Sequence, residues 1–357
     1  SEMCIRDSIM ADTLGMKYNE LLLSAIIPAV IYYMGILFQI QMRAEKMGMQ
    51  GTPKDQLPKM SQVMKEYGHL ALPIIFLVYM LFFSGKTVIM AAFYTIVFTI
   101  IVAQCRKNTR MTFQDILDAM VASAKSTVSV AIACACVGII VGSCSITGFA
   151  LNMANTIISI GGKSLMFTLV FTMITCMILG MGLPSIPSYI ITSTIAAPAL
   201  VQLGIPALVA HMFCFYFGIV ADITPPVALA AYAGSAIAKA PPMKTAWNAT
   251  RLAIAAFIIP YIFAYNNALI FVGNDVKFLS VASIVISATL GMASIASGLM
   301  GYLIRDMKAI SRVALVIGGL LMVIPGTVSD LAGLAVLVAV LVLQRIENKK
   351  DKAAASV

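Results

Sequence analysis

The sequence predicts an all-α, polytopic membrane protein, because it is very apolar, repeats long hydrophobic runs and gathers its basic residues in short clusters. Of its 357 residues, 61% are hydrophobic and only 11% are charged, and the mean hydropathy is +0.96. About a quarter of the residues in a soluble domain are charged, so this composition disfavours a water-soluble protein. The formal net charge of +9 does not indicate nucleic-acid binding, because the basic residues lie between apolar runs, as in cytoplasmic loops of membrane proteins.

Apolar runs of membrane-spanning length recur along the chain. A bilayer core of about 30 Å requires roughly 20 residues of helix. Together with the two longer, interrupted runs described below, these runs predict about nine to eleven membrane-embedded segments. The run 312–325 is short and is expected to form a hairpin with the final helix. The runs of full length lie at 20–42, 69–84, 87–105, 165–183, 186–204, 247–271, 279–304 and 328–345.

The start of the chain and one amphipathic segment stand apart from these runs. Residues 1–8, SEMCIRDS, fit nothing that follows and are interpreted as a non-native leader. The first apolar run lacks a basic region before it and a cleavage site after it, so we expect the chain to be a fragment of a larger protein. The segment Met111–Lys125 has apolar residues at helical spacing, which predicts either a helix along the membrane interface or an ordinary connecting helix.

The first interrupted run, 128–158, carries small and hydroxyl-bearing residues at its centre. A turn at this depth must line a cavity or bind something, because each unsatisfied amide in lipid costs several kcal/mol. Freed carbonyls and hydroxyls suit a monovalent cation, and half-helix N-termini favour an anion. A continuous helix that packs through its Gly and Ser residues is the alternative. The candidate residues are Gly142, Ser143, Ser145, Thr147 and Gly148.

A second candidate element, GMGLPSIPSYIITSTIAAPAL, spans Gly180–Leu200. Its first two prolines lie three residues apart and remove backbone donors, so a helix must break or kink here. A connecting loop between two spans explains the same pattern. If the element is functional, it presents backbone and hydroxyl groups to a substrate or an ion. The candidate residues are Gly180, Gly182, Pro184, Ser185 and Ser188.

The second interrupted run, 207–240, contains the sequence FYFGIVADITPPVALAAYAGSAIA. Asp222 is its clearest acidic residue at membrane depth, where a buried charge is costly. Asp222 is therefore a candidate cation ligand or proton carrier, and capping of the following half-helix is the structural alternative. Thr224, Pro225 and Pro226 complete the interruption and are candidate site residues with it.

These elements resemble the large permease of tripartite ATP-independent periplasmic (TRAP) transporters, in the fused form that works with TAXI-type binding proteins. The resemblance covers most of residues 20–345, and the pairing of GMGLPS with TPPVA about 40 residues later is specific. The matching segments are IPAVIYYMGILFQIQMRAEKMGM at 27–49, GIIVGSCSITGFALN at 138–152, ILGMGLPSIPSYII at 178–191, APALVQLGIPALVAHMFCFYFG at 197–218, DITPPVALAAYAGSAIA at 222–238 and PGTVSDLAG at 325–333.

The resemblance implies one half of an inverted-repeat, elevator-type transporter, in which each repeat holds a re-entrant hairpin and an interrupted helix. The missing first repeat of the same permease is then a partner of this chain. The implied organisation is scaffold helices at 9–110, a transport-type repeat with a re-entrant hairpin and broken helices at 111–271, and additional C-terminal membrane helices with a basic tail at 272–357. The ion and substrate region of the family matches Gly142–Gly148, Gly180–Ser188 and Asp222–Val227.

The function implied by the resemblance is import of small organic anions, namely carboxylates, from a periplasmic TAXI-type substrate-binding protein, driven by a Na⁺ or H⁺ gradient. The protein would be a multi-pass component of the bacterial inner membrane, in contact with the lipid bilayer, with no nucleic-acid partner and no cofactor. No metal is expected except Na⁺ at the same candidate residues. An intramembrane enzyme is disfavoured because the motifs GxGD, HExxH and GxSxG are absent. A passive channel or a structural membrane subunit is the remaining alternative.

Overall fold

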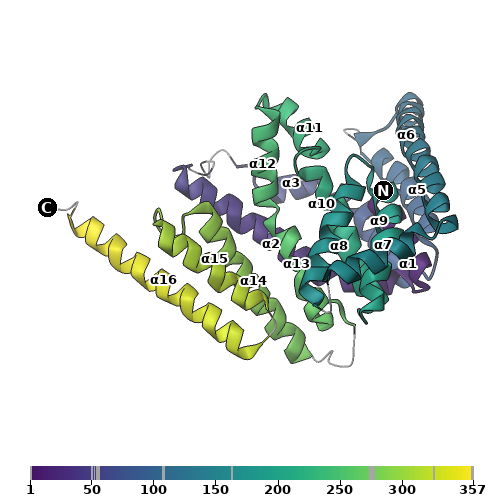
Figure 1. The fold of residues 1–357 in the computed structure, drawn as a ribbon. Helices are drawn as coiled ribbons and strands as arrows, with labels where there is room; N and C mark the ends of the chain where they lie inside the picture. Colours follow the sequence, from purple (N-terminus) through teal and green to yellow (C-terminus); the bar gives the residue numbers. More distant parts are fainter. Residues whose placement is uncertain are drawn as a thin grey trace. The chain divides into compact units, whose positions relative to one another are not determined.

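The computed structural model describes residues 2–49, 51, 53, 57–106, 109–161, 164–272, 278–324 and 326–354. Within these ranges the chain forms helices and connecting turns, which confirms the predicted all-α fold (Figure 1). The α-helices are α1 (Glu2–Leu14), α2 (Tyr18–Lys46), α3 (Met60–Tyr67), α4 (Leu72–Phe83), α5 (Val88–Gln104), α6 (Phe113–Ile146), α7 (Phe149–Gly161), α8 (Leu165–Gly180), α9 (Ser185–Gln202), α10 (Ala207–Val220), α11 (Leu229–Ala238), α12 (Pro242–Leu252), α13 (Ile254–Tyr265), α14 (Phe278–Met300), α15 (Ala309–Val323) and α16 (Thr327–Ala354). Short 3₁₀ helices are η2 (Gly68–Ala71), η4 (Ala221–Ile223) and η5 (Asn267–Ile270).

The chain forms two compact units. The first comprises Ser1–Leu22, Gly51–Ser143 and Pro184–Pro187, and the second comprises Leu23–Gln50, Cys144–Leu183 and Ser188–Val357. Residues 2–8, interpreted above as a leader, form the first turns of α1.

A helical hairpin of α4 and α5 is the main packing feature of the first unit. Phe76 and Phe98 stack across it with ring centroids 4.5 Å apart. The hydroxyl of Thr87 accepts a hydrogen bond from the backbone N–H of Met90 and so caps the start of α5. These two helices correspond to the spans expected at 69–84 and 87–105.

Helix α10 organises the core of the second unit, where it packs against α8 and α13. The aromatic rings of Phe213, Phe217 and Tyr261 contact one another edge to face, and the two phenylalanines are fully buried. Helix α2 joins this core through the side-chain amide of Gln39, which donates a hydrogen bond of 2.9 Å to the carbonyl oxygen of Leu252. The core therefore fixes the position of α10, whose C-terminal end leads into the second interrupted run.

Several helices of the described residues have the length and composition of membrane spans. Five are long and apolar enough to cross a bilayer, and a sixth crossing is possible if one bent helix pair is counted as a span. The predicted nine to eleven membrane-embedded segments are reached only when shorter apolar helices are included. The five long helices are Tyr18–Lys46, Met60–Phe83, Pro242–Tyr265, Ser280–Met300 and Thr327–Glu347, and the shorter ones are Val88–Gln104, Leu165–Gly180, Ala207–Ile223, Leu229–Ala238 and Ala309–Val323.

The first interrupted run is broken, as one of the two alternatives predicted. Helix segments Cys134–Ile146 and Phe149–Gly161 meet at an angle of 73°. The break lies at Thr147 and Gly148, and Gly148 has a positive φ of +65° that a side chain would disfavour. Its position corrects the sequence-based expectation, because Gly142, Ser143 and Ser145 remain in the continuous helix α6.

The C-terminal helices α14, α15 and α16 pack successively against one another. A Cβ atom at Gly319 in α15 would lie 2.6 Å from the carbonyl oxygen of Gly291 in α14, so the two backbones approach closely there. Leu315 of α15 is fully buried in a cluster with Leu337 and Val340 of α16. The expected hairpin between the run 312–325 and the final helix is confirmed for its described residues.

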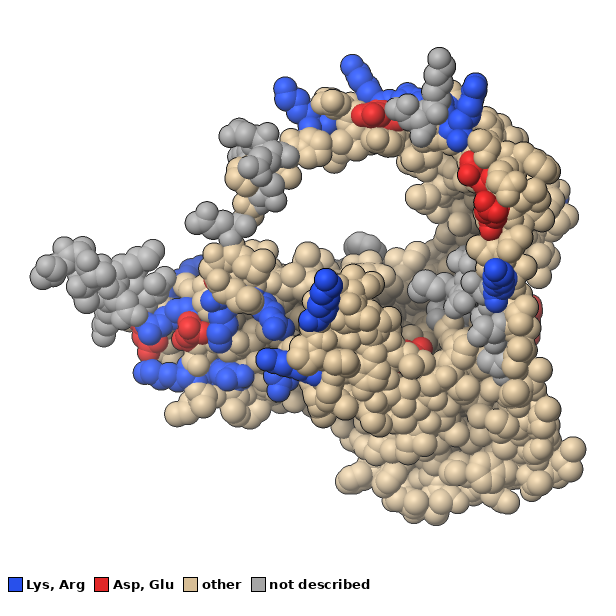
Figure 2. Space-filling model, turned by 90° about the horizontal axis from the view of Figure 1, so that it is seen from above, with Lys and Arg blue, Asp and Glu red and all other residues tan. Residues whose placement is uncertain are grey.

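Charged side chains gather in a few groups on the visible face of the molecule, and wide uncharged areas separate these groups (Figure 2). One group joins the ends of α2, α14 and α16. Lys46 forms an ion pair with Asp306 at 3.0 Å, and Arg305 and Lys308 lie 3.7 and 3.8 Å from Glu347. Such basic groups at helix ends are typical of the cytoplasmic side of a membrane protein.

Candidate functional site

The ends of α8, α9 and α10 meet at a close junction within the second unit, which we define by Gly180, Ser188, Thr192 and Gly218. A Cβ atom at Gly180 would lie 2.6 Å from the carbonyl oxygen of Gly218 and 2.8 Å from the hydroxyl oxygen of Ser188. These distances are shorter than real Cβ contacts, so only glycine fits at this position of α8. The sequence places glycine where two helix backbones must touch.

Two buried hydroxyl groups of α9 lie at this contact, and that of Ser188 bonds across it. Ser188, with only 1% of its surface exposed, donates a hydrogen bond of 3.0 Å to the carbonyl oxygen of Gly218. Thr192, fully buried, donates one of 2.7 Å to the carbonyl oxygen of Ser188. The Ser188 hydroxyl thus donates its one hydrogen bond to a protein carbonyl, and its oxygen can still accept a hydrogen bond or coordinate a cation.

The second interrupted run breaks directly after α10. Asp222 lies in the short helix η4, and the hydroxyl of Thr224 donates a hydrogen bond of 2.7 Å back to the carbonyl oxygen of Val220. Helix α11 begins only at Leu229, and its N-cap is Ala228, in the left-handed region with φ 38°. Asp222 therefore does not cap the following half-helix, and the structural alternative considered for it is wrong.

Hydroxyl groups also reach the backbone carbonyls that this break exposes. Tyr232 donates a hydrogen bond of 2.6 Å to the carbonyl oxygen of Pro226, and Thr250 donates one of 3.0 Å to that of Ile223. These two carbonyls belong to the segment 222–227, which the resemblance matches to the ion and substrate region of the family. Each is already satisfied once by the protein, which leaves one lone pair for a ligand.

One oxygen of the Asp222 carboxylate is not satisfied within the protein. Its Oδ1 atom is buried and has no hydrogen-bond partner among the described residues. The sequence from Ser164 to Ala238 contains no Lys, Arg or Glu and no other Asp, so no opposite charge is supplied by these helices. A buried carboxylate oxygen without a partner is costly, so Asp222 stays a candidate for binding a cation or a proton.

The turn between α8 and α9 approaches the same break. Gly182 in this turn has a positive φ of +73°, and a Cβ atom there would lie 3.7 Å from a methyl group of Val227. Helix α8 also contacts η4, which carries Asp222. The structure therefore brings two of the three predicted motifs together, with Gly180, Gly182 and Ser188 beside the segment 222–227.

The remaining candidate residues are not part of this junction. Pro184 precedes α9 and Ser185 begins it, so the expected break at the prolines is confirmed as a short turn between two helices. The segment Pro184–Pro187 belongs to the first unit, as do Gly142 and Ser143. Ser145, Thr147 and Gly148 belong to the second unit at the α6–α7 bend, and Cβ atoms at Gly142 and Gly148 would meet no described atom within 4 Å.

Sequence reasoning missed four residues of the site, namely Gly218, Thr192, Tyr232 and Thr250. Gly218 precedes Asp222 by four residues, and a glycine one helical turn before a break is a usable signal. The three hydroxyl residues gave no such signal, because hydroxyl residues are common in apolar helices and their neighbours at the site are set by the fold. Among the described residues, no three His, Cys, Asp or Glu side chains are grouped to hold a metal ion.

A comparison with protein-family models places these motifs in a known context. The model described as "Tripartite ATP-independent periplasmic transporter, DctM component" matches residues 6–278. The match covers most of the chain and includes both the α6–α7 bend and the α8–α11 junction. No curated protein and no solved structure matches the chain.

Proposed function

The chain belongs to the DctM component family of tripartite ATP-independent periplasmic transporters, and we propose that it imports small organic anions by coupling them to a Na⁺ or H⁺ gradient. It is a multi-pass membrane permease, as its family and its several apolar helices show. The substrate proposed is a carboxylate, and the proposed location is the bacterial inner membrane. The tripartite family description is consistent with delivery of the substrate by a separate periplasmic protein, for which we propose the TAXI type.

The buried, unpartnered Oδ1 of Asp222 is the observation that carries the proposal of ion coupling. Asp222 lies where α10 ends, beside the turn that follows α8. A carboxylate in this position gains a partner when it binds Na⁺ or a proton, so occupancy by the ion lowers the free energy of the site. Backbone carbonyls and the Ser188 hydroxyl oxygen supply further neutral ligands of the kind that hard cations prefer.

The substrate anion needs a different partner, because residues 164–238, which hold α8 to α11, contain no Lys or Arg. A half-helix begins at Leu229 in α11, within the second unit. The free backbone N–H groups and the dipole at such N-termini attract a carboxylate without a basic side chain. A cation bound at Asp222 would add to this attraction, which provides a physical basis for coupled transport.

Uptake into proteoliposomes tests the proposal. The complete permease would be reconstituted with its partner components and given a radiolabelled carboxylate, with a Na⁺ gradient, a pH gradient or no gradient. We expect accumulation above the external concentration only with one gradient and only with the binding protein present. Flux that equilibrates without accumulation indicates a channel, and absence of any flux under all conditions indicates a structural subunit.

A pair of serine variants tests the position of the site. Ser188 bonds across to α10, whereas Ser193, equally on α9 and also buried, bonds only to a carbonyl of its own helix. Ser188→Ala is expected to lower the apparent ion affinity, and Ser193→Ala should leave it unchanged. Equal effects of both substitutions on ion dependence would place the site elsewhere.

A further inference from the structure

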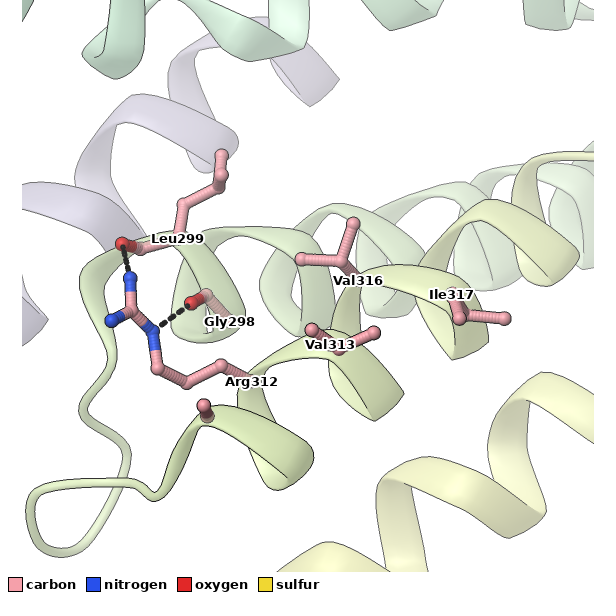
Figure 3. A pocket seen from close by; sticks show the side chains of 7 residues that line it. Gly298, Leu299, Arg312, Val313, Val316 and Ile317 are labelled. Carbon is pink, nitrogen blue, oxygen red and sulfur yellow. Dashed lines mark hydrogen bonds between the residues drawn. The ribbon is translucent and has the colours of Figure 1, made fainter.

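An apolar groove with a basic residue at one end lies between α14 and α15 (Figure 3). Its volume is about 370 Å³, and Leu299, Val313, Val316 and Ile317 line it. Arg312 closes the end nearest the turn between the two helices, as the close-up shows. The groove lies beyond residues 6–278 and outside the proposed transport site.

The groove continues an apolar face of α15 that no described helix covers. Exposed side chains recur along this face at intervals of three and four residues, so they form one stripe on the helix. The opposite face of α15 packs against α14 and α16. In a membrane protein an uncovered apolar stripe faces lipid acyl chains. The stripe consists of Ile310 (84% exposed), Val313 (57%), Ile317 (53%), Leu320 (43%) and Ile324 (55%).

The guanidinium group of Arg312 is held in place but keeps free donors. Its Nε donates a hydrogen bond of 3.1 Å to the carbonyl oxygen of Gly298, and its Nη2 donates one of 3.2 Å to that of Leu299 (Figure 3). These bonds cap the C-terminal end of α14 and fix the orientation of the planar group. Its Nη1 has no hydrogen-bond acceptor in the part of the chain that the structure describes, and the side chain is exposed.

The surroundings of Arg312 favour an anionic partner. Lys46, Arg305 and Lys308 lie at the same end of the C-terminal helices. Lys46 forms an ion pair with Asp306, and Arg305 and Lys308 lie near Glu347. Arg312 forms no ion pair among the described residues. A basic end of a helix bundle faces the cytoplasmic leaflet, which is the source of anionic headgroups.

We propose that this groove binds one anionic phospholipid of the cytoplasmic leaflet. One acyl chain lies along Val313, Val316 and Ile317, and the phosphate group accepts hydrogen bonds from Arg312. The fixed guanidinium fork suits a phosphate better than a mobile ammonium group does. The lipid would tie the α14–α15 turn to the membrane surface, independently of substrate or ion binding.

Native mass spectrometry tests this proposal. The delipidated, full-length protein is mixed with equimolar phosphatidylglycerol and phosphatidylcholine that carry identical acyl chains. We expect phosphatidylglycerol to be preferred by about fivefold at the tightest site, as one basic contact at a membrane surface allows. Arg312→Gln should reduce this preference to about parity. The matched control Arg110→Gln, at an exposed arginine of the first unit, should keep the wild-type ratio.

A second variant separates lipid binding from folding, because Arg312 also caps α14. Val313→Asn leaves the cap intact and places a polar amide in the groove, so we expect it to reduce retained phosphatidylglycerol at least severalfold. The proposal is overturned if the wild type shows no headgroup preference, as it would if another protein segment filled the groove. It is equally overturned if Arg312→Gln matches Arg110→Gln, or if Val313→Asn retains lipid as the wild type does.

Discussion

Substitution of Gly180 by alanine tests whether α8 and α10 meet backbone to backbone at the site. The added Cβ atom would lie 2.6 Å from the carbonyl oxygen of Gly218, which belongs to a helix and cannot rotate away. Overpacking of this kind costs about 1–3 kcal/mol. Replacing glycine in a helix returns about 0.5–1 kcal/mol of conformational entropy. The expected net loss in the free energy of unfolding is therefore about 1 kcal/mol, within a range of about 0 to 2.5 kcal/mol.

Gly218→Ala offers an informative contrast, because its nearest obstacle is a side chain. The new Cβ atom would lie 2.9 Å from the hydroxyl oxygen of Ser188. Ser188→Ala removes that oxygen, so it should relieve most of the cost of Gly218→Ala. The same Ser188→Ala change should not rescue Gly180→Ala, whose closest contact is with backbone.

These differences can be measured by unfolding the purified variants in detergent, either by heating or by titration with a denaturing detergent. Gly234→Ala is the matched control, because Gly234 lies in α11 and a Cβ atom there meets no described atom within 4 Å. It should be neutral or slightly stabilising. If Gly180→Ala unfolds like Gly234→Ala, or if Ser188→Ala rescues both glycine variants equally, the close backbone contact is refuted.

Two further predictions concern the break after α10 and the start of α6. Tyr232→Phe removes the hydroxyl that donates a hydrogen bond to the carbonyl oxygen of Pro226, and it should cost about 1 kcal/mol in the free energy of unfolding. The control is Tyr33→Phe, at a residue that is 67% exposed, which should cost nothing measurable in the same melting experiment. The pKa of Asp115 is lowered because the Thr112 hydroxyl and backbone N–H donate hydrogen bonds to its carboxylate. These hydrogen bonds therefore stabilise the folded protein when the pH is above the usual pKa of an aspartate. The stabilisation is lost as the pH falls through the lowered pKa. Thr112→Val should raise the pKa of Asp115 towards its usual value in an NMR titration, and an unchanged pKa would contradict the assignment.

The sequence predicted the helices and their interruptions well, because both are local properties. Runs of apolar residues define the spans, and prolines or glycines mark where helices end, as at Pro184 and at Pro225. The bend of the first interrupted run was predicted as one of two alternatives, and its position only as the range 142–148, at the end of which the bend lies. Gly142 and the neighbouring serines tolerate a helix, whereas Gly148 adopts a conformation that ends one.

The site was predicted only in part, because some of its residues are recognisable from the local sequence and others are not. Asp222 is recognisable from the sequence, since a carboxylate in an apolar run is unusual. Tyr232 and Thr250 could not be assigned, because an apolar helix does not reveal which of its faces meets which neighbour. The helix α6 was also longer than predicted, since the segment expected at 111–125 continues into the first interrupted run without a breaking residue.

Gradient-driven uptake by an Asp222→Asn variant of the complete permease tests whether Asp222 couples transport to an ion gradient. The substitution keeps the shape of the side chain but removes its charge, so the ion loses the one acidic ligand of the junction. Asp118→Asn, at an exposed position of α6, is the control for loss of a carboxylate. We expect that Asp222→Asn folds normally but no longer accumulates carboxylate in response to a Na⁺ or H⁺ gradient, whereas Asp118→Asn accumulates it as the wild type does. Wild-type accumulation with unchanged ion dependence in Asp222→Asn would contradict this expectation.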